Sequence, residues 1–385
     1  MTATADVLII GAGIIGGSVA FHLLERNPRL RVTILEAEPE VGTGSTSKAT
    51  GGVRFQFSTE ANIRLTLLSY RYFTDAEAIL GRSVDFMRHG YLFVTTDPAT
   101  LARSREAVAL QRFLGVRSEV LAPADIQRHL EPLVVADLVG GTFCADDGSA
   151  DPHGMLQGFL ARGRERGLQV LVGHRVIALL RDGERVVGAR TAQGDFHAPV
   201  VINCAGPYAD QVGALAGVEI PSKPYRRQVL VTSPLPILPD VFPLIVDLDT
   251  GFYVHRQGKS AVLMGGTDKD IKPGLDTTVD WEAFGAVFQA AAKRVPPLAE
   301  AKVMRAYAGV RDLTPDYHGI LGPARTAPGF HVACGFSGHG FMHAPAIGLL
   351  MAEIVLDGRT SSMDIDALSL DRFGAGTTRA EANMF

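Results

Sequence analysis

Short apolar runs separated by glycine-rich turns open the chain. Residues Val7–Ile10 form a continuous apolar run of the length expected for a strand buried on both faces. A glycine-rich turn follows at Gly11–Gly16. Apolar residues then recur with helical spacing to about Arg26, where an Asn-Pro pair predicts the helix end. With a second strand predicted at Arg31–Glu36, this order indicates a β-α-β unit at the start of an α/β protein.

The rest of the chain mixes both periodicities. Helices are predicted near residues 98–130 and 280–300, and a last apolar helix at about Pro345–Leu356. Strands are predicted at Gln169–Val172, Arg185–Arg190, Val200–Asn203, Gln228–Thr232, Gly251–His255, Ala261–Gly265 and Phe330–Cys334. No Pro- or Ser-rich linker divides the chain. We therefore expect an α/β fold with an added mixed sheet.

Composition narrows the possible functions. The 385 residues are 46% hydrophobic and carry a formal net charge of −4, so nothing favours nucleic acid or an anionic membrane as partner. No apolar run approaches the roughly 18 residues of a spanning helix. No basic stretch precedes the first strand, as a secretory signal would require. The three cysteines lie far apart, which argues against a disulfide framework, a zinc site or an iron–sulfur cluster. We expect a cytoplasmic protein.

The first glycine turn has the spacing of a dinucleotide-binding loop. Gly11, Gly13 and Gly16 follow the G-x-G-x-x-G pattern between a predicted strand and a predicted helix. In that pattern the first glycine makes the turn, the second admits a pyrophosphate to the backbone, and the third lets helix pack on strand. Glu36 follows Gly16 by 20 residues, where an acid binds a ribose hydroxyl. A chance glycine cluster is the alternative, and the motif alone does not separate NAD from FAD.

A second glycine turn near the end of the chain favours a flavin. The predicted strand Phe330–Cys334 leads through Gly335–Gly340 into the last helix. Backbone N–H groups at such a helix start stabilise negative charge at N1 and O2 of a reduced flavin. An NAD dehydrogenase more often devotes its second domain to substrate alone.

Several motifs carry a family resemblance that spans essentially the whole chain. The sequence resembles the D-amino-acid-oxidase-like flavoproteins, in the branch of glycine oxidase, sarcosine oxidase and sarcosine-oxidase β-subunit-like amine dehydrogenases. Its most specific landmarks are Gly309–Pro323 and Gly335–Phe341, and Val200–Ala209 supports them. The "DPHG" stretch at Asp151–Gly154 also matches, although a helix N-cap explains it equally well.

The resemblance implies FAD bound in an extended form. It implies a Rossmann-like FAD-binding domain from residues 1–85, 145–222 and 306–385, interleaved with a mixed-sheet α+β substrate domain from residues 86–144 and 223–305. The implied FAD-binding residues are Gly11, Gly13, Ile14, Ile15, Gly16, Glu36, Ala37, Gly44, Ser45, Thr46, Gly51, Gly52, Val176, Cys204, Ala205, Gly206, Arg311, Gly338, His339, Gly340, Phe341 and Met342. Within this set, Val176 would hold the adenine by its backbone, and residues 338–341 would face the isoalloxazine.

The chain departs from its relatives at positions that matter for the flavin. Relatives with covalent flavin use a cysteine or a histidine where this chain has Gly309 and Lys48. Non-covalent FAD is therefore expected. Monomeric sarcosine oxidases carry a lysine in the strand matching Ala261–Gly265, which here has none, and another at the position of Met342. Rapid use of O₂ is therefore not expected.

Two arginines are candidates for holding a substrate carboxylate. By resemblance, Arg54 matches the position used in sarcosine oxidases, and Arg311 the one used in glycine and D-amino-acid oxidases. A guanidinium suits a carboxylate because it offers two parallel, permanently charged donors. The alternatives are structural ion pairs, of Arg54 with an acid such as Glu60, and of Arg311 with Asp312 or Asp316. Arg227 is a third and weaker candidate.

Other candidate site residues are polar side chains near the same motifs. Tyr253 and His255 alternate with apolar neighbours, so both point into the pocket if their strand floors it. A half-buried strand would show the same alternation without any chemistry. His339 more often positions backbone in such a loop than acts as an acid or base, and His343 is a weaker candidate.

These residues indicate an FAD-dependent amino-acid or amine oxidoreductase. A C–N bond of an amino acid or N-methyl amine would be oxidised by hydride transfer to flavin N5, and the imine would then hydrolyse. The electron acceptor would be O₂, a protein or a quinone, and homo- or hetero-oligomers are possible. The alternative is a non-catalytic FAD-binding partner or assembly subunit. An aromatic hydroxylase is disfavoured, because its G-D phosphate motif does not follow Val310.

Overall fold

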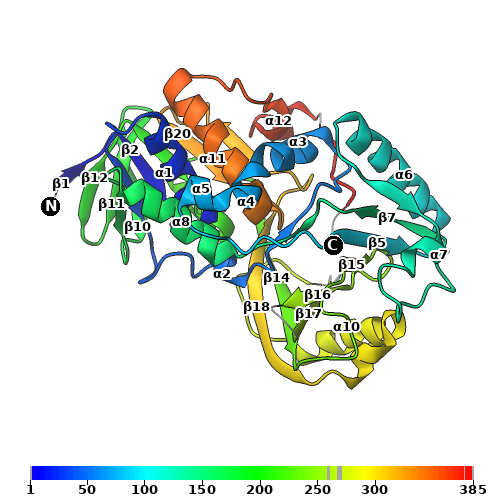
Figure 1. The fold of residues 1–385 in the computed structure, drawn as a ribbon. Helices are drawn as coiled ribbons and strands as arrows, with labels where there is room; N and C mark the ends of the chain where they lie inside the picture. The colour runs from blue at the N-terminus through cyan, green and yellow to red at the C-terminus, as the bar shows by residue number, and fades with distance from the viewer. Residues whose placement is uncertain (1, 258–260, 267–270, 377, 384–385) are drawn as a thin grey trace.

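The computed structural model describes residues 2–257, 261–266, 271–376 and 378–383 (Figure 1). Its central element is a six-stranded sheet in the order β19-β20-β13-β2-β3-β9. All neighbouring strands run parallel except β19, which pairs antiparallel at the edge. The strands are β2 (Val7–Ile10), β3 (Val32–Leu35), β9 (Gln169–Leu171), β13 (Val200–Asn203), β19 (Ile320–Pro323) and β20 (Phe330–Cys334).

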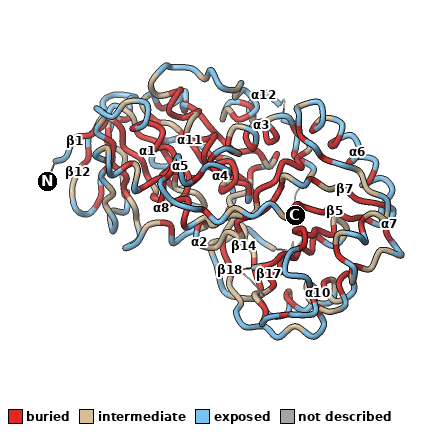
Figure 2. The backbone as a smooth tube through the Cα atoms, viewed as in Figure 1, coloured by how far each residue is buried: buried red, intermediate tan, exposed pale blue. Residues whose placement is uncertain are grey.

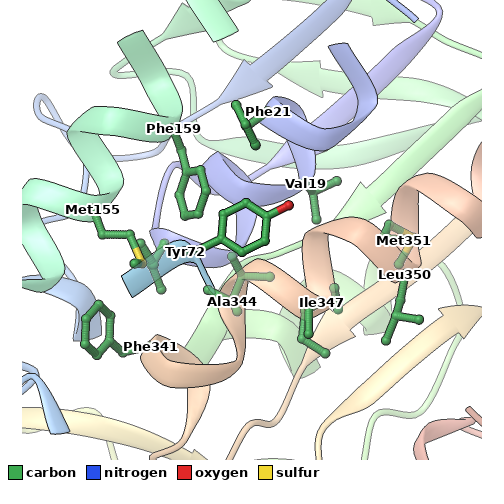
Figure 3. Close-up of a cluster of buried hydrophobic side chains, with 14 of the residues drawn as sticks. Val19, Phe21, Tyr72, Met155, Phe159, Phe341, Ala344, Ile347, Leu350 and Met351 are labelled. Atoms are coloured by element: carbon green, nitrogen blue, oxygen red, sulfur yellow. The ribbon is translucent and has the colours of Figure 1, made fainter. Parts of the chain in front are cut away.

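Helices cover one face of this sheet. The covering helices are α1 (Ile14–Arg26), α3 (Glu60–Ser69), α8 (Pro152–Arg164) and α11 (Gly340–Asp357). Val7 and Ile9 of β2 belong to the same buried cluster as the aromatic and aliphatic side chains between these helices. Figure 3 shows Phe21, Phe159 and Tyr72 packed together in this cluster. The predicted helix after the first glycine turn is confirmed.

A small sheet covers the other face. Leu8 and Ile10 of β2 pack with Val186 and Phe196 of this sheet, whose strand order is β1-β12-β11-β10. Since β2 is buried from both sides, its continuous apolar run is explained. The elements are β1 (Thr2–Thr4), β10 (Val176–Asp182), β11 (Arg185–Thr191), β12 (Gly194–His197) and, nearby, α9 (Ala209–Leu215).

An eight-stranded mixed sheet forms the other half of the molecule, in the order β18-β14-β17-β16-β15-β5-β7-β6. Its strands are β5 (Tyr91–Thr95), β6 (Glu119–Leu121), β7 (Gly140–Cys144), β14 (Lys223–Thr232), β15 (Leu244–Asp247), β16 (Tyr253–Gln257), β17 (Ala261–Gly265) and β18 (Val303–Leu313). The long strands β14 and β18 form an antiparallel ribbon that reaches toward the six-stranded sheet (Figure 1). The predicted α/β fold with an added mixed sheet is confirmed, whereas the domain boundaries stay a prediction.

The two faces of this larger sheet differ. Phe252 and Val254 lie in an apolar cluster with Phe284 of α10 (Trp281–Arg294), which covers that face. Tyr253, between them, belongs to a second cluster on the opposite face with Tyr91. Both clusters are buried, as the red segments of Figure 2 show along these strands. We call these the α10 face and the inner face.

Helix α11 passes the length and composition test for a membrane-crossing helix. However, 72% of it is buried inside the protein, and it packs against α1 and α3, as a core helix does. It begins at Gly340 rather than near Pro345, which lies inside the helix. Because proline often occupies the first turn of a helix, the start of α11 was predicted too late in the sequence.

Some predicted elements are wrong. The helix expected over 98–130 ends at Phe113, because Gly115 takes a left-handed φ of +90° and a short strand, β6, follows. Strands β5, β7, β15 and β18 were not predicted. The truncated helix is α6 (Pro98–Phe113), and the remaining short elements are α2 (Ser45–Lys48), β4 (Gly52–Val53), α4 (Arg71–Thr74), α5 (Ala76–Leu80), α7 (Pro123–Ile126), β8 (Gly148–Ser149) and α12 (Arg372–Ala375).

Candidate active site

The three motif glycines have different roles at the start of α1. A Cβ on Gly11 would collide with the carbonyl of Cys204, and one on Gly16 with the carbonyl of Gly11. These two glycines are therefore required by the packing itself. A Cβ on Gly13 would meet only the hydroxyl of Thr46, at 3.4 Å. The packing therefore does not require Gly13, which fits the second glycine of the pattern, where a pyrophosphate approaches the backbone.

Glu36 lies beside this turn. One carboxylate oxygen accepts the N–H of Ala12 at 2.7 Å and the other accepts the N–H of Glu38 at 2.9 Å. The N–H of His174 donates to the Glu36 carbonyl at 2.7 Å, which brings the turn before Val176 to the same edge. The predicted adenosine-side residues Glu36, Ala37 and Val176 thus lie in neighbouring segments.

The loop after β3 connects the glycine turn with β18. Thr46 Oγ1 accepts the N–H of Ile14 at 3.0 Å, and Ser45 Oγ donates to the carbonyl of Val310 at 2.6 Å. A Cβ on either Gly44 or Gly206 would meet nothing within 4 Å. Near the start of α1, Gly44 and Gly206 therefore face open space, and Gly13 faces only the Thr46 hydroxyl.

Other predicted cofactor residues serve the fold directly. A Cβ on Gly51 would collide with the carbonyl of Ala150, and one on Gly52 with the Tyr91 hydroxyl. The side chains of Ile14, Ile15, Phe341 and Met342 are buried in the helical core, and Cys204 and the neighbouring Ala205 line the Gly11 turn. Figure 3 shows Phe341 pointing into that core. The structure thus leaves only the backbone of Phe341 and Met342 to face a ligand.

Arg54 is buried at the boundary between the two halves, with 2% of its surface exposed. Its Nη1 donates to the Gln56 carbonyl at 2.5 Å, and its Nη2 to the Asn383 carbonyl at 2.7 Å. The guanidinium lies 3.8 Å above the Phe57 ring centre. Burial, with a smaller contribution from the Arg311 charge, lowers the Arg54 pKa to about 10, although the charges of Glu381 and Asp147 act in the opposite direction. The proposed structural partner Glu60 binds Arg64 instead, at 2.6 Å.

Arg311 lies on the inner-face side of β18. A Cβ on Gly338 would come within 2.9 Å of its Cδ and Nε, so glycine there allows Arg311 to cross the second glycine turn. Of its two proposed structural partners, Asp316 is bound by Arg372 at 2.8 Å. The other, Asp312, accepts the N–H of Gly335 at 2.7 Å. The structure thus places the half-buried Arg311 close enough to the buried Arg54 for its charge to act on the Arg54 pKa.

Two histidines pack beside Arg54. His339 Nε2 lies 3.3 Å from Arg54 Nη2, and its ring meets Phe57 edge-on. Burial lowers the pKa of His339 well below its usual value, and Arg54 adds to this shift. His343 bonds to Thr66 at 3.1 Å, and burial lowers its pKa to about 3. Both rings are thus neutral near pH 7, and His343 has a packing role.

The inner face supplies the opposite wall. Burial raises the pKa of the Tyr253 hydroxyl, while the charges of Arg311 and Arg227 oppose this shift. Arg227 pairs with Gly309 across the ribbon, so it shares the inner face with Arg311 despite its weak sequence signal. His255 follows Tyr253 by two residues and is buried. Among the described residues its Nε2 has no hydrogen-bond partner, and burial lowers its pKa to about 4.

Sequence reasoning missed a buried carboxylate behind Arg54. Asp147 is fully buried and accepts the N–H of Phe55 at 2.7 Å and the Gln56 side-chain amide at 3.0 Å. It thereby fixes the loop that carries Arg54. Burial raises the Asp147 pKa to about 7. No motif surrounds it, and only the unusual "ADDG" turn before β8 could have suggested it. The matching landmark at Asp151 is an N-cap, accepting the His153 N–H at 2.9 Å.

A cavity of about 920 Å³ borders the β14–β18 ribbon. Lys223, Tyr225 and Arg227 of β14 line it together with Leu313 at the end of β18. Tyr225 is the cross-strand neighbour of Arg311. The cavity is therefore a candidate route by which a small molecule reaches the two arginines.

Comparison with known proteins identifies the fold and the family. The FAD dependent oxidoreductase family, DAO, matches residues 6–354. The chain belongs to this family. Human mitochondrial sarcosine dehydrogenase is 28% identical over 97% of this chain and 42% of its own length. The structure of L-proline dehydrogenase from P. horikoshii superposes with a TM-score of 0.92 at 27% identity, over 98% of this chain and 100% of that one.

A further solved structure supports the fold alone. Glycine oxidase from Geobacillus kaustophilus superposes with a TM-score of 0.85 at 23% identity, over 96% of this chain and 99% of that one. The chain spans less than half the length of the sarcosine dehydrogenases it matches. The predicted resemblance and the mixed α/β fold are confirmed.

The DAO family assigns FAD as cofactor, and the residues around α1 fit it. Gly44 and Gly206 leave open space where a larger residue would place a Cβ, and at Gly13 a Cβ would contact only the Thr46 hydroxyl. The start of α1 offers backbone N–H groups to a pyrophosphate, and Thr46 can donate its hydroxyl proton while accepting from Ile14. Gly309 faces the Lys48 side chain. These are the two positions at which relatives with covalent flavin carry a cysteine or a histidine, and this chain has neither residue there.

Proposed function

We propose that this protein oxidises the C–N bond of an amino acid or N-alkyl amino acid. The observation that carries the proposal is the proximity of the buried Arg54 and the half-buried Arg311, between the FAD-family glycine turns and the inner face. The Arg311 charge acts on the buried Arg54, so an anionic ligand bound between them would be attracted by both guanidinium groups. An amino-acid carboxylate supplies that charge and matches the guanidinium geometry.

The relatives support the same class of substrate. Sarcosine and L-proline, named by two of the relatives, are both secondary amines with a carboxylate on the adjacent carbon. A carboxylate anchored by Arg311 and Arg54 would hold such a molecule by one end. Fixing the orientation of the reacting C–H bond in this way accounts for much of the rate of a two-substrate reaction.

The site needs little proton-transfer chemistry. FAD, when bound, supplies the two-electron acceptor for a hydride. His339 and His255 are neutral near pH 7 because burial depresses their pKa values. Neither ring therefore adds positive charge beside the amine. The buried aromatic residues Phe57, Tyr91 and Tyr253 exclude water, and the imine product would hydrolyse once it reached solvent.

An anaerobic titration tests this function. The purified protein should contain one FAD per chain, and acid precipitation should release all of it. Adding sarcosine, L-proline or other amino acids without O₂ should bleach the flavin absorbance for at least one compound. Flavin that no amine of the panel reduces, while dithionite does, would contradict oxidation and favour a non-catalytic FAD-binding subunit.

The electron acceptor is part of the proposal. β17 contains no lysine, and Met342 occupies the position of the other lysine of monomeric sarcosine oxidases. We expect turnover with an artificial dye to exceed turnover with O₂. Fast, stoichiometric peroxide formation in the absence of dye would contradict this expectation.

A further inference from the structure

The segment Glu381–Asn383 crosses the region of Arg54. The Asn383 carbonyl accepts from Arg54 Nη2 at 2.7 Å, and the Asn383 side-chain amide donates to the Gln56 carbonyl at 3.1 Å. That same Gln56 carbonyl accepts from Arg54 Nη1. In Figure 1 the red C-terminal segment descends from α12 toward β5. A part of the chain more than 320 residues away in sequence thus contacts the candidate carboxylate site.

Glu381 anchors this segment. Its carboxylate accepts from the Ser58 N–H at 2.7 Å, the Ser58 hydroxyl at 2.6 Å and the Thr59 hydroxyl at 2.8 Å. The Asn62 amide adds a bond at 3.1 Å. Although Glu381 is only 1% exposed, these bonds and the nearby Arg54 charge keep its pKa below the usual value, against the effect of burial. A buried charge with this many donors holds its segment firmly.

Neighbouring backbone bonds hold the segment in register. The Ala382 N–H donates to Ser58 Oγ at 2.8 Å, and the Asn383 N–H to Glu381 Oε1 at 3.0 Å. The carbonyl of Asn383 is consequently placed on Arg54 by Glu381 and Ser58. A carbonyl oxygen and a carboxylate oxygen use the same guanidinium N–H in the same way, but only the carboxylate brings a charge.

We propose that Glu381–Asn383 is a built-in occupant of the Arg54 site, which a substrate carboxylate must displace, and that Glu381 thereby sets how tightly the site selects for carboxylates. This proposal rests on the proposed function only in assigning Arg54 to a carboxylate. A ligand with a neutral oxygen gains nothing by replacing a carbonyl, whereas an anion gains its attraction to Arg54 and Arg311. Since the open form is a minor population, the apparent affinity for every carboxylate is reduced by the open fraction.

Glu381→Gln tests this role. The amide retains one acceptor oxygen but loses the charge and presents a donor toward Ser58 or Thr59, so the segment should be held less tightly. Ala382→Pro is the second variant, because it removes the N–H that binds Ser58 while keeping the Glu381 charge near Arg54. Arg379→Ala is the matched control, since Arg379 is exposed in the same segment. Each holoenzyme is titrated with acetate, a carboxylate that the flavin cannot oxidise, while flavin absorbance is followed.

The expected result is a lower acetate Kd, by roughly tenfold, in Glu381→Gln and Ala382→Pro, with Arg379→Ala unchanged. With an amino acid that the protein oxidises as substrate, KM should fall by a similar factor while kcat stays constant. Amide hydrogen exchange adds a readout that does not depend on turnover. Saturating acetate should speed exchange at Ala382 and Asn383 in the unmodified protein.

Other outcomes would overturn the proposal. A higher acetate Kd in both variants would make the segment a fixed wall of the site. Unchanged exchange on adding acetate, with unchanged Kd values, would show that the segment is not displaced. A protein that binds acetate as expected but oxidises no amine would refute the proposed function and leave this inference standing.

Discussion

The buried arginines beside the two faces of the eight-stranded sheet differ in their partners and in the direction of their pKa shifts. On the α10 face, Arg294 binds Asp247 at 2.9 Å and Asp137 at 2.7 Å, and these partners raise its pKa above the usual value against the effect of burial. Beside the inner face, Arg54 contacts carbonyl oxygens, a neutral histidine and an aromatic ring, and the nearby charges of Glu381 and Asp147 do not offset the effect of burial. Its pKa falls to about 10.

The difference distinguishes a charge that completes the fold from one that we propose serves a ligand. Arg294 joins α10 to the sheet through protein carboxylates, so its interactions are complete without any other molecule. Arg54 has a lowered pKa and lies near a second cation, Arg311, so under the proposed function an anionic ligand would interact with both. Clustering of perturbed groups in one buried region is typical of functional sites. The predictions below test this comparison.

Blocking the proposed pyrophosphate site at the start of α1 should have the largest effect. Gly13→Val would place a branched side chain where the pyrophosphate approaches the backbone. We expect the variant to fold, because a Cβ there meets only Thr46, but to purify without FAD. Gly285→Val is the control, since a Cβ at Gly285 in α10 meets nothing within 4 Å. Flavin content is read from the absorbance spectrum, and a fully yellow Gly13→Val protein would refute this cofactor placement.

Removing an inner-face arginine should lower activity rather than stability. Arg311→Ala and Arg54→Ala each remove a buried partner of the carboxylate, at a cost of roughly 3–5 kcal/mol. That corresponds to about two to four decades in kcat/KM for an acidic amine, with FAD content unchanged. Arg305→Ala, on the same strand as Arg311, is the control. The loss should shrink for an amine without a carboxylate. A variant with near-normal kcat/KM on the carboxylate-containing amine would show that its arginine does not bind the substrate carboxylate.

The corresponding change on the α10 face should act on stability. Arg294→Ala leaves Asp247 buried without its ion pair, which should lower the free energy of unfolding by roughly 3–5 kcal/mol. KM should stay constant, because α10 lies on the far side of the sheet. Arg128→Ala breaks an exposed pair and should cost about 0–1 kcal/mol. Urea unfolding measures both. A KM change as large as that of Arg311→Ala would erase the distinction between the two faces.

A smaller, pH-dependent effect is expected from Asp147. Burial raises its pKa to about 7 from the usual 3.8. The folded protein therefore binds more protons than the unfolded chain between these values. Its contribution to stability is fully present below about pH 4 and is lost as the pH rises toward 7. Asp147→Asn should remove this decline, whose slope is at most about 1.4 kcal/mol per pH unit. Unfolding free energies at several pH values measure it, and identical slopes in both proteins would contradict the assignment.

Local patterns predicted the parts of the fold that depend on local physics. The run Val7–Ile10, the glycine turn and α1 follow from apolar spacing and the need for glycine at Gly11 and Gly16. The long ribbon strand β18 escaped prediction, because half-buried polar residues such as Arg311 interrupt its apolar pattern. The prediction extended helix α6 too far, because the residues after Gly115 have helical spacing. They include strand β6, and only its pairing with β7 reveals it.

The candidate site shows the same division. Short motifs were enough to predict a dinucleotide loop, an FAD-type family and two arginines suited to a carboxylate. The three-dimensional structure was needed to show that Arg311 lies near Arg54, that Arg227 shares the face of Arg311, that Asp147 holds the Arg54 loop, and that Glu381 holds a segment against Arg54. Such relations depend on which strands pair and which distant segments pack together. No local spacing specifies a contact between Arg54 and Asn383, because chain packing alone brings them to 2.7 Å.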